Sequence, residues 1–283
     1  MVEWISKYEA VIRLGSFFGV FVLMATWELL APRRTLTVSK PSRWLNNITL
    51  TALNTLVLRL LFPASAMGVA VWAAQQGWGL LNRVDWPALV EWLCAVVVLD
   101  VLIYLQHVMF HAIPLLWRLH RVHHADLDFD VTTGARFHPV EIVLSMLIKF
   151  AAILLLGPAA GAVLLFEVIL NASSMFNHGN VRLPRALDRM LRLLIVTPDM
   201  HRVHHSRIPD ETNSNFGFYL SLWDRLFGTY RAQPVDGHEA MTIGIDTWRD
   251  AVHCIYLPGL LALPFLGKVN DYAINRRRWG RAP

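Results

Sequence analysis

Residues 120–124 of the chain read His-Arg-Val-His-His, and the same pentapeptide recurs at residues 201–205. A His-x-x-x-His pair precedes the first copy. Imidazole binds zinc, copper, iron and nickel, and one metal ion usually takes three or four protein ligands. Eight clustered imidazoles therefore predict a dinuclear, all-histidine site, with these ligands: His107, His111, His120, His123, His124, His201, His204 and His205.

The spacing within the clusters suits metal binding better than packing. His107 and His111 are four residues apart, so on a helix both project from one face. In each His-x-x-His-His unit the first two histidines can converge on one metal while the third points toward the other. Adjacent imidazoles serve no packing purpose and would repel one another if protonated. Few arginines lie nearby and no basic stripe extends from them, which excludes a nucleic-acid surface.

The composition is that of an integral membrane protein. Of the 283 residues 55% are hydrophobic and only 17% are charged, and the mean hydropathy is +0.40. The two cysteines, Cys94 and Cys254, form no C-x-x-C motif and imply no disulfide framework. The chain has no G-x-G-x-x-G or P-loop pattern for a nicotinamide, flavin or nucleotide. Any electrons must therefore come from outside this chain.

Apolar segments predict an all-α bundle of about four to five transmembrane or re-entrant helices. The second segment contains Arg59 and Pro63 and should be kinked or tilted. Residues 157–161 (Gly-Pro-Ala-Ala-Gly) should form a tight turn between the last two, which could cross the membrane or be re-entrant. A cleaved signal peptide is the alternative for the first segment. The segments are residues 14–31, 48–75, 88–111, 140–156 and 162–176.

Charge predicts the orientation of this bundle. The connection after the first segment carries Arg33, Arg34, Lys40 and Arg43 and no acidic residue, so the positive-inside rule places it in the cytoplasm. Counting crossings from there puts every histidine cluster on the cytoplasmic side. We therefore expect a multi-pass protein with a cytoplasmic, histidine-rich helical cap that holds the dimetal site.

Three regions follow from this organisation. Residues 1–87 supply two N-terminal transmembrane helices, residues 88–230 carry the histidine clusters, and residues 231–283 form a cytoplasmic or interfacial tail. Within the tail, residues 255–266 are apolar but too short to span, which favours an interfacial segment. Arg276–Arg278 with Trp279 could contact an anionic lipid surface or be a merely solvated basic tail.

Further residues are candidates for ligands or for hydrogen bonds that orient the imidazoles. His178 lies just after the fifth segment and is a candidate ninth ligand. His138 lies just before the fourth, and it is either a ligand or a hydrogen-bonded structural residue. Asp100 and Tyr104 share a helix face with His107, and an unpaired Asp100 would be costly in a membrane helix. Asp199, Asn213 and Asn215 are candidates for the same orienting role, although loop capping is an equal alternative for each.

Other metal centres fit the pattern less well. Carboxylate-bridged di-iron proteins use a Glu-x-x-His motif on each of two helices, and no such motif occurs here. A bis-histidine haem needs isolated histidines that face each other within helices. A zinc transporter would place its ligands near the bilayer midplane.

With these motifs in place, the chain resembles the fatty acid hydroxylase superfamily, also called the sterol desaturase family, of membrane-bound non-haem di-iron enzymes. The three histidine boxes match its eight-histidine signature, over roughly residues 88–230. Its surrounding pattern is similar in Thr197-Pro198-Asp199-Met200, in Asn215-Phe216-Gly217 and in residues 223–229 (Trp-Asp-Arg-Leu-Phe-Gly-Thr). One departure is that Arg182, not histidine, stands four residues after His178.

The resemblance implies two iron ions, molecular oxygen, and oxidation of an unactivated C–H bond in a lipid such as an acyl chain or a sterol. Hydroxylation is favoured, with desaturation as the alternative outcome at the same centre. The substrate would enter from the bilayer, and a separate electron-transfer protein would supply electrons. The alternative of another class is a non-catalytic membrane protein that binds zinc through the same histidines. The sequence does not identify the lipid, the oxidised carbon, the electron donor or the oligomeric state.

Overall fold

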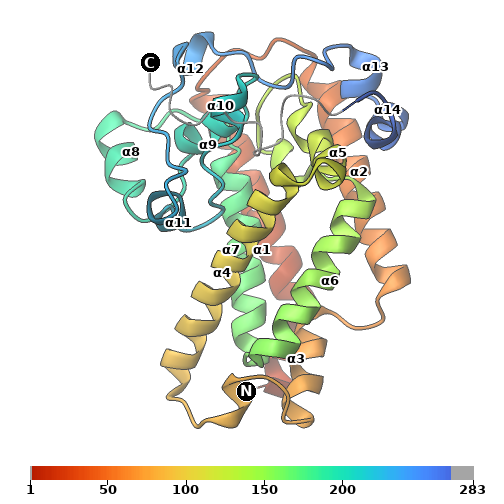
Figure 1. Cartoon of the computed structure of the whole chain (residues 1–283), viewed down its shortest axis with the longest axis vertical. Helices are drawn as coiled ribbons and strands as arrows, with labels where there is room; N and C mark the ends of the chain where they lie inside the picture. Colours follow the sequence, from red (N-terminus) through yellow and green to blue (C-terminus); the bar gives the residue numbers. More distant parts are fainter. Residues whose placement is uncertain (1, 269–283) are drawn as a thin grey trace.

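The computed structural model describes residues 2–268, which form helices and isolated bridges but no strand. Long helices make a bundle, and short helices make a cap at one end of it (Figure 1). The bundle helices are α1 (Val2–Leu30), α2 (Lys40–Leu61), α3 (Ala66–Gln75), α4 (Ala88–Ala112), α6 (Pro139–Leu156) and α7 (Ala160–Asn177). The cap contains α5 (Pro114–His124), α8 (Arg185–Leu191), α9 (Pro198–His204), α10 (Pro209–Thr212), α11 (Leu222–Leu226), α12 (Gly237–Ala240), α13 (Ala251–Cys254) and α14 (Leu257–Ala262), and the short 3₁₀ turns are Leu81–Arg83, Thr133–Ala135 and Leu263–Phe265.

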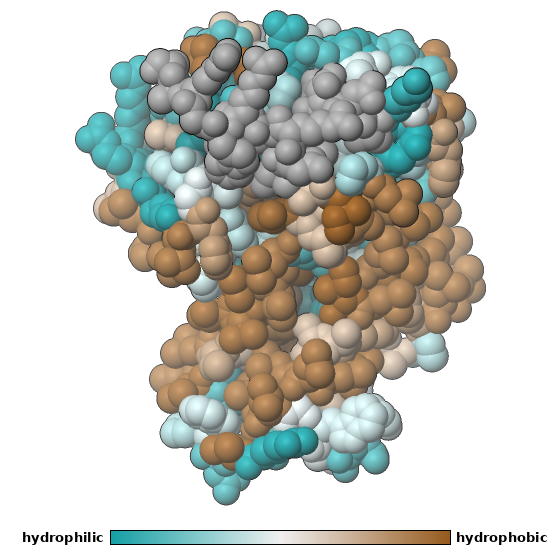
Figure 2. Space-filling view, viewed as in Figure 1, coloured by the Kyte–Doolittle hydropathy of each residue, from teal (hydrophilic) through white to brown (hydrophobic). Residues whose placement is uncertain are grey.

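Among the described residues, five stretches are long and apolar enough to cross a membrane, which confirms the helical membrane bundle. They are Trp4–Leu30, Lys40–Gln75, Ala88–Ala112, Pro139–Leu156 and Ala160–Asn177. Apolar residues cover the bundle as a band, whereas the cap and the opposite end are more polar (Figure 2). The first helix begins twelve residues before the predicted segment, and it packs along α7 as part of the bundle. This packing supports a membrane helix rather than a signal peptide.

The second stretch is interrupted where the sequence predicts a kink. Helix α2 ends at Leu61, and α3 begins at Ala66 after residues 62–65. Pro63 lacks the N–H that would continue the helical ladder. The Ser65 side chain then accepts a hydrogen bond from Gly68 N and caps α3. The interruption therefore has a local chemical cause.

The turn between α6 and α7 lies at the end of the bundle opposite the cap (Figure 1). Gly157 ends α6 with φ 67°, a left-handed conformation that glycine adopts without strain. The turn also packs tightly against Gly79, where an added Cβ would lie 2.2 Å from Gly157 N. Both helices therefore run the length of the bundle, which favours two crossings over a re-entrant hairpin.

Helix α5 turns the chain from the bundle into the cap. Pro114 at its first position ends the run of α4 and begins a helix in a new direction. One face of α5 buries Trp117 and Val122 in a cluster with Leu260 and Leu263 from the C-terminal part of the chain. The apolar segment 255–266 is thus packed partly inside the cap, whereas Tyr256 and Phe265 are exposed, and its interfacial position stays a prediction. Arg276–Arg278 and Trp279 lie outside the described residues.

Candidate metal centre

The predicted ligands meet where the bundle joins the cap. The sharp turn at Pro114 folds α5 back over the end of α4, so the two histidines of α4 face His120 and His124 of α5. His178 follows the last residue of α7. The final box lies on α9 and on His205 directly after it, and α9 packs beside α7. All nine side chains are at most 4% exposed: His107, His111, His120, His123, His124, His178, His201, His204 and His205.

The nine histidines divide into two groups, each able to hold a metal ion. Within each group, one nitrogen from every ring lies within 4.8 Å of those from the others. The first group holds His107, His111, His120, His124 and His204, and the second holds His123, His178, His201 and His205. In both pentapeptides, adjacent histidines contribute to different groups. Two neighbouring metal sites are therefore the arrangement that this geometry supports.

Hydrogen bonds fix the tautomers of several rings. His107 Nδ1 lies 2.8 Å from the carbonyl oxygen of Phe216. A carbonyl only accepts, so Nδ1 carries the proton and Nε2 presents a lone pair. His178 and His204 make the same contact, each at 2.7 Å, with the carbonyls of Ser174 and Ser214. These three rings are therefore held with Nε2 free to bind a metal.

Lone pairs consequently face one another. His107 Nε2 and His120 Nε2 are 3.1 Å apart, and the second ring directs its Nδ1 to Glu141 Oε1 at 2.6 Å. When both rings are neutral and protonated on Nδ1, no proton is available to join the two Nε2 atoms. Two imidazole nitrogens about 2.1 Å from a shared ion, at roughly a right angle, lie about 3.0 Å apart. The observed separation fits a metal between them, and the pairs His111–His124 (3.1 Å), His123–His178 (3.2 Å) and His178–His201 (3.2 Å) repeat it.

Other ring nitrogens are buried without a hydrogen-bond partner among the described residues. They are His123 Nδ1, His201 Nδ1, His204 Nε2 and both nitrogens of His205. A buried nitrogen without a partner is unfavourable, and metal coordination is one way to satisfy it. The donor set therefore fits two metal ions.

Burial also keeps the cap histidines neutral. It lowers the pKa of His120, His123, His124, His201, His204 and His205 well below 6.5, and the neighbouring imidazoles lower it further. The pKa of His178 falls to about 3, again mainly through burial. Neutral imidazole is the form that binds metals. The pocket is thus in the binding form at neutral pH.

His138 lies outside both groups. Its Nδ1 accepts a hydrogen bond from Val140 N at the start of α6, and its Nε2 lies 3.3 Å from the Leu261 carbonyl. This corresponds to the structural alternative considered for it from the sequence. Arg182, which replaces a possible histidine, forms an exposed ion pair with Glu239 instead.

Of the residues expected to orient imidazoles, Asn213 contacts one directly. Its Oδ1 lies 3.2 Å from His111 Nδ1. Asn215 has φ 51°, and its amide bonds the backbone of Met200 and Arg231, so it shapes the loop after α9. The two asparagines therefore have different roles.

Asp100, Tyr104 and Asp199 bond to other partners. The Asp100 carboxylate accepts from Trp223 Nε1 at 2.7 Å and from Leu220 N at 3.2 Å, so its described bonds differ from the expected contact with an imidazole. Asp100 has these partners because this part of α4 faces residues 216–229. The same segment supplies the Phe216 carbonyl that accepts a hydrogen bond from His107. The Tyr104 hydroxyl bonds Thr229 in the same segment, whereas Asp199 pairs with Arg33 and Arg202.

Sequence reasoning missed Glu141 and three backbone acceptors. Glu141 lies in the first turn of α6, is 4% exposed and accepts from His120. An acidic residue soon after a histidine at a predicted membrane boundary was an available signal. The carbonyls of Ser174, Ser214 and Phe216 have no residue-type signature, because every residue carries a carbonyl group.

A buried acidic loop after α5 was also missed. Asp126 accepts two hydrogen bonds of 2.7 Å from Arg43 on α2, and Asp130 pairs with the same guanidinium at 2.5 Å. Despite burial, Arg43 and Arg136 lower the pKa of Asp126 to about 2. Arg43 is thus part of the fold that surrounds the histidines and not simply a loop charge.

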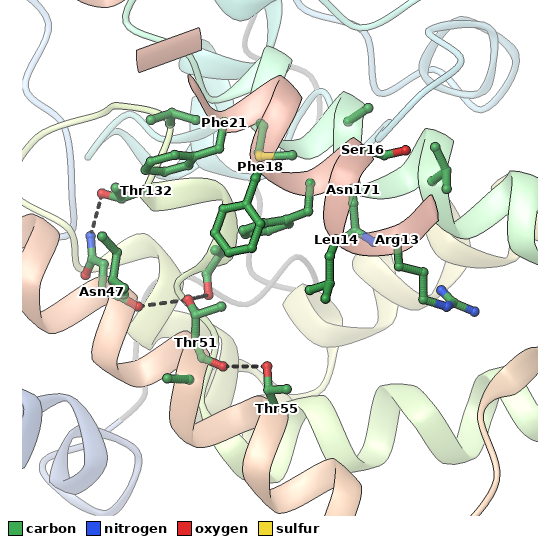
Figure 3. Close-up of a pocket in the computed structure, with 18 residues that line it drawn as sticks. Arg13, Leu14, Ser16, Phe18, Phe21, Asn47, Thr51, Thr55, Thr132 and Asn171 are labelled. Atoms are coloured by element: carbon green, nitrogen blue, oxygen red, sulfur yellow. Dashed lines mark hydrogen bonds between the residues drawn. The ribbon is translucent and has the colours of Figure 1, made fainter. Parts of the chain in front are cut away.

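Two cavities with shared lining residues lie in the bundle, and the inner one reaches this centre. The inner chamber, about 330 Å³, is lined by His107, His120 and Glu141 and by residues of α2, α4, α6 and α7. The outer chamber, about 380 Å³, lies among α1, α2 and α7 (Figure 3). Both are lined by Phe17, Thr51, Thr55, Ala135, Asn171 and Met175. The two chambers therefore lie side by side and share part of their lining.

In a comparison with known protein families, residues 92–229 match the model of the fatty acid hydroxylase family. Ornithine lipid hydroxylase OlsE of Rhizobium tropici is 29% identical over 150 residues, which cover 53% of this chain and 44% of that protein. Human (Homo sapiens) alkylglycerol monooxygenase is 28% identical over 158 residues, which cover 54% of this chain and 33% of that protein. Very-long-chain aldehyde decarbonylase GL1-1 of Oryza sativa subsp. indica is 27% identical over 176 residues, which cover 58% of this chain and 28% of that protein. The matches thus span less than half the length of these relatives, and no solved structure matches the chain.

Proposed function

Because residues 92–229 match the fatty acid hydroxylase family model, we propose that the protein is a membrane-bound oxygenase that oxidises an unactivated C–H bond of a lipid. The observation that carries this proposal is the pair of neutral histidine groups next to a cavity within an apolar bundle. Relatives named for ornithine lipid, alkylglycerol and very-long-chain aldehyde support a lipid as substrate. A hydroxylase and a monooxygenase among them favour hydroxylation over desaturation.

The nine histidines would hold two iron ions, five ligands in one group and four in the other. When bound there, the irons would supply the redox chemistry that activates molecular oxygen. In the overall reaction one oxygen atom enters the C–H bond as a hydroxyl. The other leaves as water, with two electrons from a separate electron-transfer protein and two protons.

The surrounding residues orient the ligands and exclude water. Glu141 and the Phe216 carbonyl hold the two rings that line the inner chamber, and such outer contacts raise ligand basicity and fix ring direction. Phe110 and Phe137 line the same chamber, and Phe137 stacks on His123 with ring centroids 4.5 Å apart. An apolar wall here would keep solvent from the reacting carbon.

The cap would lie in the cytoplasm. The connections at the cap end, residues 31–39 and 113–138, carry five arginines, whereas those at the far end, residues 76–87 and 157–159, carry only Arg83. This excess of positive charge supports the orientation through the positive-inside rule. Labelling of a cysteine introduced at exposed Arg182 should occur only after the membrane is permeabilised, and labelling of intact cells would reverse the orientation.

The test of function combines metal analysis with isotope labelling. Protein purified from iron-replete cells should contain about two irons per chain. Membranes supplied with ¹⁸O₂ and a reductant should then form a lipid that has gained one labelled oxygen. Loss of two hydrogens without label would indicate desaturation. Stoichiometric zinc without iron-dependent turnover would contradict the oxygenase and favour the zinc-binding alternative.

A further inference from the structure

The two chambers differ in the chemistry of their walls. Aromatic and aliphatic side chains dominate the outer chamber, among them Phe18, Phe21 and Ile48, which suit a hydrocarbon chain. The outer chamber also has the polar residues Arg13, Asn47 and Asn171, but only the inner chamber places carboxylates and a lysine, namely Glu141, Glu167 and Lys149, beside two histidines. A cavity meant only for hydrocarbon would not need these groups, because burying a polar group against an apolar chain is costly.

Three acceptor oxygens in the inner chamber have no partner among the described residues. They are Asn54 Oδ1, Gln106 Oε1 and Glu141 Oε2, and each atom is buried. Asn54 is only 6% exposed, and its Nδ2 donates to the Phe137 carbonyl at 2.8 Å. Gln106 Nε2 donates to Ser145 Oγ at 2.9 Å. These donor contacts fix both amides so that their oxygens remain available to a ligand with hydrogen-bond donors.

A charged cluster lies farther from the histidines. Glu167 on α7 pairs with Lys149 on α6 at 2.6 Å and with Arg13 on α1 at 2.5 Å, and Arg13 also pairs with Glu9 at 2.8 Å. The four formal charges cancel. Lys149 and Glu167 are each about ten residues, or about 15 Å of helix, from the cap ends of α6 and α7.

Charged residues at this depth of a membrane bundle are rare and commonly mark substrate sites. Lys149 and Glu167 both line the inner chamber, whereas Arg13 lines the outer one. Lys149 Nζ can donate three hydrogen bonds and makes one described bond, to Glu167. The cluster can therefore still donate to an acceptor group in the chamber.

From the residues that line the two chambers, we propose that the inner chamber binds the polar head group of the lipid substrate. The hydrocarbon chain of the same lipid lies in the outer chamber. Head-group donors would bond Asn54 and Gln106, and a head-group acceptor would bond Lys149. This inference rests on the proposed function. It specifies that the oxidised carbon lies in the head group or next to it, not in the distal half of the chain.

The position of incorporated oxygen tests this orientation. Cells with and without the gene are grown under ¹⁸O₂, and tandem mass spectrometry locates the label within each new lipid. Label in the head-group fragment, or on the carbons joined to it, is expected. Label in the distal half of the chain would overturn the inference and leave the oxygenase proposal intact. Absence of any gene-dependent label would instead contradict the proposed function.

Lys149 variants separate substrate positioning from helix packing. Lys149→Met should lower labelled product about tenfold per unit of membrane-inserted protein and spread the label to further carbons, because one anchoring hydrogen bond is lost. Lys149→Arg should restore both amount and position. Lys7→Met, which removes an exposed lysine from α1, is the matched control and should change neither. A Lys149→Met protein that is less abundant but labels the same carbon would show that the cluster only ties helices together.

The outer chamber predicts a different response. Ala52 lines the outer chamber but not the inner one, so Ala52→Phe would shorten the space for the chain. Labelled lipids should shift to shorter chains while the label stays at the same head-proximal carbon. A label that moves along the chain with unchanged chain length would contradict this placement.

Discussion

Arg43 and Asp126, 83 residues apart in the chain, are joined by two hydrogen bonds of 2.7 Å, and neither side chain is exposed. The pair joins the start of α2 to the loop that follows His124. Asp130 accepts from the same guanidinium, and Thr133 Oγ1 lies 3.2 Å from it. The cap is thus anchored to the bundle beside the metal ligands.

Arg43→Met should strongly destabilise the protein. Removing one partner leaves Asp126 and Asp130 with less compensating charge in a buried site, a change that typically costs about 3–5 kcal/mol. Thermal unfolding of the detergent-solubilised protein would measure the loss. The control is Arg207→Met, which removes an exposed pair with Asp246 and should cost less than about 1 kcal/mol. Similar unfolding temperatures for the two variants would contradict a structural role for the Arg43 pairs.

Glu141→Leu should lower iron content and turnover by about 10- to 100-fold, because His120 would lose the acceptor that fixes its tautomer. Glu141→Gln keeps a carbonyl oxygen at that position and should retain more of both. Glu91→Gln is the control, since Glu91 bonds Ala159 N at the far end of the bundle. Full iron loading of Glu141→Leu would show that the contact is dispensable.

His204→Ala should abolish product formation while the protein remains inserted in the membrane. The variant loses one of five nitrogens in the first histidine group. His138→Ala should keep its iron and lose only about 1 kcal/mol of stability, because it removes a helix cap. Iron analysis and product formation on equal amounts of membrane protein distinguish the two histidines. Loss of iron from the His138 variant would instead make that residue a ligand.

Asp224 should make stability depend on pH. Burial raises its pKa from 3.8 to about 6, so the folded protein holds this proton more tightly than the unfolded chain does. Its contribution to stability is therefore fully present below about pH 4 and is lost as the pH rises through about 6. The stability of wild type minus that of Asp224→Asn should fall by up to about 1.4 kcal/mol per pH unit across this interval. A constant difference between pH 4 and 7 would rule out the raised pKa.

The helices and the meeting of the histidines were predictable because local chemistry encodes them. Long apolar runs require helices in a membrane, Pro63 breaks one of them, and Gly157 permits the turn between α6 and α7. The repeated His-x-x-His-His spacing likewise predicted two clusters that would need a shared centre. The sequence predicted best those residues, such as histidine, proline and glycine, whose side-chain type limits them to few structural roles.

The partners of these histidines were less predictable because they depend on tertiary packing. Asp100 shares a helix face with His107, yet the loop packed against that face supplies Trp223 and Leu220 as its partners. Glu141 reaches His120 only because α6 packs beside α5. Periodicity locates a residue on a helix face but does not identify what covers that face.

The division of histidines between the two groups also has a consequence for biogenesis. Four of the five in the first group come from residues 107–124, whereas three of the four in the second come after residue 177. During synthesis, most of the first site can therefore assemble before α6 and α7 are inserted. The first group also needs His204 and the second needs His205, so neither histidine group is complete before residue 205 has been synthesised.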